Sequence, residues 1–250
     1  MFAASLIEVR ASAAPASRLF PPLPPTVRPL LGHLAGADLW RAALAVCDTV
    51  MGGASFARLR VPPGLDEESG AVFEGTVRAD GGGGFATVRA PLAPPAALEA
   101  ADCDALLLHV RGDGRRYSLR AFAAPGRGLR GELAFEARFS TTRGEAQEVF
   151  VPLRALRARW RGADVAGAPP PRSCAELGAL GFMATKGEAG LGDFALECMG
   201  IYGVREDERQ RERDRTVAIT GGASDGGGGA NANSGGGGGG GSAVAGPGLS

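Results

Sequence analysis

Short stretches of alternating apolar and polar residues recur between glycine and proline breaks through the middle of the chain. In the clearest one, Leu133, Phe135 and Phe139 alternate with Glu136 and Arg138. A period of two places one face of a strand in a core and the other in water. The pattern predicts nine strands, near 56–61, 71–78, 84–90, 105–111, 115–122, 132–140, 146–152, 178–184 and 193–201. Nine strands without a long helical pattern favour an all-β sandwich or jelly roll.

Composition separates a predicted folded part from its flanks. Residues 1–37 are rich in Ala, Pro, Leu and Ser and carry three arginines against one acid, Glu8. That bias is typical of an organellar transit peptide and also of a disordered extension. Residues 38–204 hold the strand pattern. Residues 205–220 begin with mixed charges and are expected to form a charged linker or solvated helix, and residues 221–250 a glycine-rich disordered tail.

Charge and cysteine content exclude several classes of function. The 250 residues contain 27 basic and 27 acidic side chains, so the chain lacks the basic excess typical of nucleic-acid binding. No apolar run reaches the roughly 18 residues of a transmembrane helix. The four cysteines, Cys47, Cys103, Cys174 and Cys198, form no C-x-x-C pair and are interpreted as free thiols. We therefore expect no metal site and no cofactor.

Two motifs and two histidines are of kinds that occur in catalytic sites, but the sequence around each of them does not support catalysis. The G-x-G-x-x-G match at 126–131 precedes a strand pattern rather than a helix, which favours a hairpin turn. The G-x-S-x-G match at 222–226 lies in the glycine-rich tail. His33 lies in the proline-rich start, and His109 is interpreted as a partly exposed strand residue. The sequence thus predicts a protein that is not an enzyme.

Three segments combine glycines with polar residues beyond what plain turns need: 48–55, 73–89 and 111–117. They are either well-made turns with ion pairs or a binding surface. We expect Gly52 or Gly53 to adopt a positive φ. We also expect Asp48, Arg89, Arg111 and Asp113 to converge at one end or on one face of the sandwich and to carry function there. The full candidate surface is Asp48, Thr49, Met51, Gly52, Gly53, Ser55, Gly84, Phe85, Arg89, Arg111, Asp113, Arg115 and Tyr117.

These segments resemble the complex I intermediate-associated protein 30 family. The matching stretches are DTVMGGAS at 48–55 with Trp40 before it, FEGTV at 73–77, GGFATVRA at 83–90, RGDGRRY at 111–117, FST at 139–141, EVFVPL at 148–153, RWRG around Trp160, LGFM at 180–183 and GDFALE at 192–197. They occur in the family's order and cover about residues 38–204.

The resemblance implies a galactose-binding-domain-like jelly roll and a non-enzymatic assembly factor, or chaperone. Such a protein binds intermediates of mitochondrial respiratory complex I (NADH:ubiquinone oxidoreductase) together with other assembly factors. It implies a place on the matrix side of the mitochondrion, peripheral to the inner membrane at most. A chloroplast assembly factor is the alternative, because some plant and algal relatives occur in plastids. A carbohydrate or small-ligand binding module is a further alternative, although aromatic residues for stacking make up only 6% of the chain.

Overall fold

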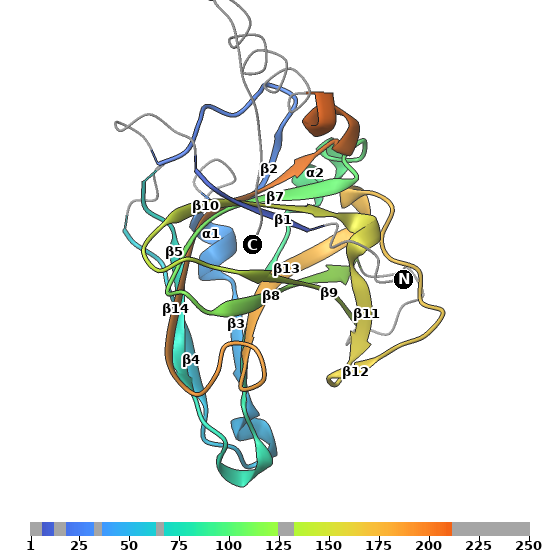
Figure 1. Ribbon diagram of the computed structural model, residues 1–250. Coiled ribbons are helices and arrows are strands. Elements are labelled where there is room, and N and C mark those ends of the chain that lie inside the picture. The colour runs from blue at the N-terminus through green and yellow to red at the C-terminus, as the bar shows by residue number, and fades with distance from the viewer. Residues whose placement is uncertain (1–6, 13–18, 33–36, 64–67, 125–132, 212–250) are drawn as a thin grey trace, which may run out of the picture. The chain divides into compact units, whose positions relative to one another are not determined.

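Fourteen strands pack as two antiparallel sheets in the computed structural model, which describes residues 7–12, 19–32, 37–63, 68–124 and 133–211 (Figure 1). The first sheet has the order β1-β10-β7-β14-β5-β4, with β2 also paired to β14. Its strands are β1 Glu8–Ala11, β10 Ala146–Pro152, β7 Ala105–Gly112, β14 Gly192–Val204, β5 Ala71–Val77, β4 Phe56–Arg60 and β2 Arg28–Gly32.

The second sheet has the order β12-β11-β9-β8-β13-β6-β3. Its strands are β12 Ala163–Asp164, β11 Arg157–Trp160, β9 Ala134–Ser140, β8 Arg116–Ala123, β13 Leu177–Thr185, β6 Phe85–Pro91 and β3 Leu44–Cys47. The helical elements are α1 Ala37–Arg41, α2 Pro94–Glu99 and four short 3-10 turns, η2 Asp48–Met51, η3 Asp80–Gly82, η4 Leu153–Ala155 and η5 Cys174–Glu176. Residues 206–211 are also helical.

The core lies between the two sheets and follows from the period of two. Leu106 and Leu108 on β7 face Leu119 and Phe182 from the second sheet, and all four side chains are fully buried. All nine predicted strands are confirmed, and the fold is the predicted jelly-roll sandwich. The five strands that the pattern did not predict are short, with two to five residues each, which leaves little room for a period of two to show.

The folded domain extends N-terminal to residue 38, which corrects the boundary expected from composition. Strand β1 pairs with β10 and strand β2 pairs with β14. On β2, Leu30 and Leu31 are completely buried in the core. Sheet pairing and apolar burial therefore hold this segment in place despite its proline-rich composition. A transit peptide within residues 1–37 stays a prediction.

The same N-terminal segment covers the outer face of the first sheet. Phe20 stacks on the ring of His109, with 3.9 Å between the ring centroids and 6° between the planes. His109 is only 4% exposed and lies 3.3 Å from a carboxylate oxygen of Glu148. The prediction of a partly exposed histidine was wrong, because a segment far away in the sequence covers it.

The charged region that starts at residue 205 begins as a helix, which is one of the two structures expected for it, a linker or a solvated helix. Within residues 206–211, Arg209 Nη2 lies 2.6 Å from Glu148 Oε2, and Glu206 pairs with Arg154 at 3.0 Å. The glycine-rich tail, the motifs at 126–131 and 222–226, and His33 lie outside the described residues. Among the helices that the structure does describe, none is long and apolar enough to cross a membrane.

Candidate functional site

The buried carboxylate of Asp48 ties three loops together at one end of the sandwich. Its Oδ1 accepts the backbone N–H of Ser55 at 2.9 Å, and its Oδ2 accepts the Ser55 hydroxyl at 2.5 Å. The same Oδ2 accepts the backbone N–H groups of Gly84 at 2.5 Å and Phe85 at 3.2 Å. The Asp48 side chain thus fixes η2, the start of β4 and the start of β6 against one another.

The environment of Asp48 favours its charged form. Burial acts to raise the pKa of the carboxyl, but the hydrogen bonds from Ser55, Gly84 and Phe85 outweigh it and hold the pKa below its ordinary value. Gly53 and Gly83 make room for the carboxylate, because a Cβ on either would lie 2.4 Å from its atoms. Gly52 ends η2 with a φ of 86°, which confirms the predicted positive φ in the Gly52–Gly53 pair.

This framework leaves apolar side chains uncovered along one continuous segment. Val50 and Met51, on η2, are 72% and 68% exposed. Leu44 and Val46 on β3 and Phe56 on β4 are exposed as well. We call these five residues the apolar edge. Of the predicted surface, Thr49, Met51 and Gly52 are exposed here, whereas Asp48 and Ser55 are buried supports.

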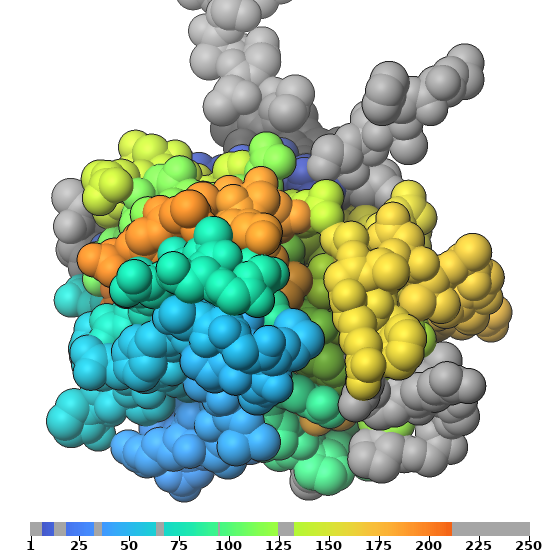
Figure 2. Space-filling view, turned by 90° about the horizontal axis from the view of Figure 1, so that it is seen from below, coloured from blue at the N-terminus to red at the C-terminus, as the bar shows by residue number. Residues whose placement is uncertain are grey.

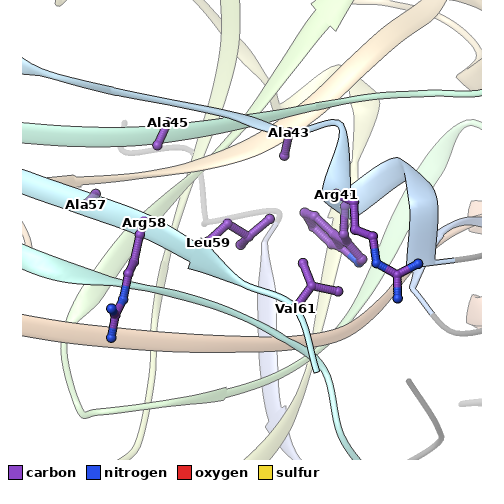
Figure 3. Close-up of a pocket in the computed structure, with 8 residues that line it drawn as sticks. Arg41, Ala43, Ala45, Ala57, Arg58, Leu59 and Val61 are labelled. Atoms are coloured by element: carbon purple, nitrogen blue, oxygen red, sulfur yellow. The ribbon is translucent and has the colours of Figure 1, made fainter. Parts of the chain in front are cut away.

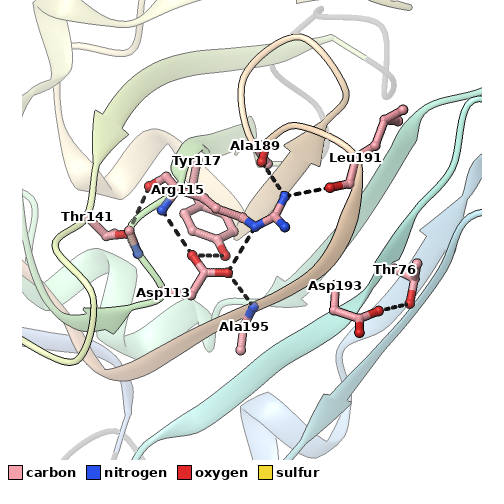
Figure 4. Close-up of polar contacts among 10 residues, drawn as sticks. Thr76, Asp113, Arg115, Tyr117, Thr141, Ala189, Leu191, Asp193 and Ala195 are labelled. Atoms are coloured by element: carbon pink, nitrogen blue, oxygen red, sulfur yellow. Dashed lines mark hydrogen bonds and ion pairs between the residues drawn. The ribbon is translucent and has the colours of Figure 1, made fainter.

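A second carboxylate, Asp113, holds the loop between β7 and β8 (Figure 4). Its Oδ1 accepts the Tyr117 hydroxyl at 3.0 Å and the Arg115 backbone N–H at 3.1 Å. Its Oδ2 accepts the Ala195 backbone N–H at 3.0 Å and lies 3.3 Å from Arg115 Nε. Tyr117 is fully buried, and burial, with the charge of Asp113, raises its pKa. Tyr117 is therefore a core residue and not part of a binding surface.

The loop 186–191, between β13 and β14, joins the two carboxylate clusters. On one side Lys186 Nζ donates to the backbone oxygen of Gly83 at 2.9 Å, next to Asp48's partner Gly84. On the other side Arg115 donates to the backbone oxygens of Ala189 and Leu191. Figure 2 faces this end, where the blue, turquoise and orange parts of the chain lie side by side.

Only part of the predicted convergence is found. Asp48 and Asp113 share this end, but Arg89 and Arg111 lie on the outer faces of different sheets. Arg111 pairs with Glu197 at 2.6 Å instead of with Asp48 or Asp113. Arg89 lies over the ring of Phe122, 4.1 Å from its centroid. Burial and the neighbouring charge of Arg120 lower the pKa of Arg89.

Four residues of the apolar edge were missed by sequence reasoning: Leu44, Val46, Val50 and Phe56. The sequence pattern predicted no strand at 44–47, and an apolar residue on a predicted strand, such as Phe56, is usually interpreted as core. The one indication in the sequence is that the small residues Ala43 and Ala45 alternate with Leu44 and Val46, a pattern that is typical of an edge strand. No group of three metal-binding side chains occurs in the described part of the chain.

The fold and these loops define a jelly-roll β-sandwich module with a partly apolar end. A family 11 carbohydrate-binding module from Clostridium thermocellum, in complex with a β-1,3-1,4-mixed-linked tetrasaccharide, has the same fold. It is 12% identical, with a TM-score of 0.50 over 72% of this chain and 96% of the module. The family 11 module of a cellulosomal cellulase from that organism is also 12% identical, with a TM-score of 0.49 over 72% of this chain and 96% of that one.

The chain belongs to the complex I intermediate-associated protein 30 family, whose profile matches residues 34–198. The matched span includes α1, the Asp48 cluster, the Asp113 cluster and most of both sheets. Membership supports a role in complex I assembly in general. No curated protein sequence matches the chain.

Proposed function

We propose that this protein is a non-enzymatic assembly factor that binds intermediates of respiratory complex I through the apolar edge. One observation carries the proposal: five apolar side chains, Leu44, Val46, Val50, Met51 and Phe56, are exposed on the segment that Asp48 holds rigid. Exposed apolar side chains that lie together, as Val50 and Met51 do on η2, mark contact surfaces for other proteins or membranes. Family membership supports partners related to complex I, and in this proposal they are its assembly intermediates.

Rigidity makes the apolar edge suitable for holding a partner. Four hydrogen bonds fix the Asp48 carboxylate, so little ordering of the loop remains to oppose binding. Each buried apolar Å² contributes roughly 25 cal/mol, and several large side chains are available on this edge. The acids at this end are engaged in holding loops, so the protein acts in this proposal by binding and not by catalysis.

The partners in this proposal are subunits or intermediates of complex I and other assembly factors. In this proposal the protein works on the matrix side of the mitochondrial inner membrane. The alternative is that it is an assembly factor of the plastid. A carbohydrate-binding role has support only from the fold that the chain shares with the Clostridium thermocellum module, and fold by itself does not assign function.

Capture of complex I subunits from mitochondria tests the proposal. The variant Met51→Glu places a charge on the apolar edge, and Leu98→Glu is the matched control, because Leu98 is 67% exposed on α2. Both variants should melt like the wild type, since neither side chain is buried. Wild type and Leu98→Glu should capture complex I subunits, identified by mass spectrometry, and Met51→Glu should not. Equal capture by Met51→Glu, or no complex I subunit with the wild type, would contradict the proposal.

A further inference from the structure

A groove separates the two sheets where their edge strands β3 and β4 lie next to each other. Strand β3 pairs with β6 and strand β4 with β5, and no ladder joins β3 to β4 in the described part of the chain. The groove has a volume of about 420 Å³. Figure 3 shows Ala43 and Ala45 on one wall and Ala57 and Leu59 on the other. The edges of β3 and β4 that pair with no other described strand therefore face one cavity, and the Ala57 backbone N–H bonds the Cys47 side chain between them.

The walls of the groove combine small apolar side chains with exposed polar groups, including two arginines, Arg41 and Arg58. Three of the lining side chains are alanines, and Leu59 and Val61 extend the wall along the direction of β4. Ala45 is exposed, so the space in front of it is open to a partner. The volume lies in the range of about 300–1,000 Å³ that binding sites in proteins commonly have. A chain with small or apolar side chains fits such walls.

Trp40 lines the same groove, and its indole N–H has no hydrogen-bond partner in the described part of the chain. The residue is 1% exposed, so this donor is buried. Leaving such a buried donor unpaired destabilises the folded protein. A carbonyl oxygen brought in by a bound chain would satisfy it. The unpaired donor is thus a second sign, besides the cavity itself, that the groove takes a ligand.

Open strand edges pair readily with an extended chain, and natural proteins protect them with charges. Strand β4 has this protection, because it carries Arg58 and Arg60. Strand β3 lacks it, because its four residues are Leu44, Ala45, Val46 and Cys47. Two of them, Leu44 and Val46, belong to the apolar edge. Strand β3 is therefore the edge on which an incoming strand would be received.

Among the described residues at the rim of the groove, arginines outnumber the carboxylates with which they pair. Arg58 and Arg60 share a single carboxylate, that of Glu74, at 2.7 and 3.7 Å. Arg41 pairs with Asp38 at 2.8 Å. Three arginines thus stand against two carboxylates, and all three arginine side chains are at least half exposed. An acidic residue in the bound chain would complement this excess.

We propose that the groove binds an extended segment of a partner protein, which adds as a strand to the free edge of β3. A backbone carbonyl of the segment accepts the hydrogen bond from Trp40 Nε1–H. The segment's small or apolar side chains lie on Ala43, Ala45 and Ala57, and an acidic residue lies near Arg58. This inference deepens the proposed function and rests on it for the identity of the partner, a complex I subunit. It adds the mode of recognition, strand addition at a defined edge.

Peptide binding tests the groove separately from capture of whole subunits. The probes are overlapping synthetic peptides that tile the complex I subunits of the same organism. Ala45→Trp fills the groove, and Ala163→Trp is the matched control, because Ala163 is an exposed alanine on β12, the opposite edge of the same sheet. Wild type and Ala163→Trp should bind the same peptides, and Ala45→Trp should bind none. Hydrogen exchange of the bound wild type should show new protection at residues 44–47.

A second variant tests the groove independently, in case Ala45→Trp disturbs folding. Trp40→Phe removes the indole N–H, and loss of one hydrogen bond should weaken peptide binding about tenfold. The inference is overturned if no peptide binds, if Ala45→Trp binds like Ala163→Trp, or if bound peptides leave residues 44–47 unprotected. Peptide binding without capture of subunits would instead contradict the proposed function alone. Capture of subunits without peptide binding would contradict the groove alone.

Discussion

Asp48 and Gly84 are joined by a hydrogen bond of 2.5 Å between side chain and backbone, although they are 36 residues apart. The bond links η2, which carries Val50 and Met51, to the first residues of β6 in the second sheet. A surface loop with exposed apolar residues would ordinarily be mobile. Here a buried charge determines its shape, and the shape is what a partner protein would recognise.

Replacing Asp48 by Ala should destabilise the domain by about 3 kcal/mol or more. The substitution leaves the Ser55, Gly84 and Phe85 donors without their acceptor in a buried place. Urea denaturation followed by circular dichroism measures the change. The control is Asp193→Ala, because Asp193 is exposed and accepts only from Thr76 in the described contacts. The two variants should differ clearly; equal stability would mean that Asp48 does not hold the loops.

Stability should also depend on pH through Asp48. Because the folded protein holds the pKa of this carboxyl below its ordinary value of 3.8, the contribution is complete above about pH 4. It is lost as the pH falls through the lower, folded-state pKa. The wild type should therefore lose stability below about pH 4 more steeply than Asp48→Asn. Parallel pH profiles for the two proteins would contradict this.

The neighbouring glycines should differ in their tolerance of a side chain. At Gly52 a Cβ meets no atom within 4 Å, so Gly52→Ala costs only the strain of its positive φ, about 1 kcal/mol. At Gly53 a Cβ would lie 2.4 Å from the Asp48 carboxylate, so Gly53→Ala should cost more. Gly187→Ala, with open space and no positive φ, is the control with little effect. Melting temperatures in the order Gly187→Ala, Gly52→Ala, Gly53→Ala, from highest to lowest, are expected.

Truncations should locate the true start of the folded domain. Removing residues 1–18 deletes β1, whose residues are mostly exposed, and should cause a modest loss of stability. Removing residues 1–37 also deletes β2 with the buried Leu30 and Leu31, each worth about 2–5 kcal/mol, and should prevent folding. An import signal that is removed on entry must then end before Arg28. Similar melting curves for the two truncated proteins would contradict the assignment of β2 to the core.

Alkylation should distinguish the four cysteines of the folded protein. Burial raises the pKa of the Cys103 thiol to about 12 and also raises those of Cys174 and Cys198. Cys47 is less buried, and burial raises its pKa above the ordinary 9.0. Iodoacetamide should therefore modify Cys47 first, at a rate that still rises as the pH passes 9. A Cys47→Ser variant that reacts as fast as the wild type would show that another thiol is the accessible one.

Local sequence was sufficient where a property depends on neighbours along the chain. The alternation in β9 predicted a strand with one buried face, because side chains of a strand alternate between faces wherever it lies. The turn at Gly52 was predicted for a similar reason, since only glycine enters the left-handed region without a steric cost. The family motifs around Asp48 and Trp40 are likewise local.

Tertiary structure decided what depends on segments far apart in the chain. Phe20 buries His109, and β2 joins β14, although the composition of residues 1–37 predicted an extension apart from the domain. Arg89 and Arg111 separate onto different sheets because sheet assignment follows from strand pairing, which local periodicity does not specify. The groove between β3 and β4 exists for the same reason. The sequence by itself determined which residues form strands; packing of remote strands decided which of their edges and side chains stay open.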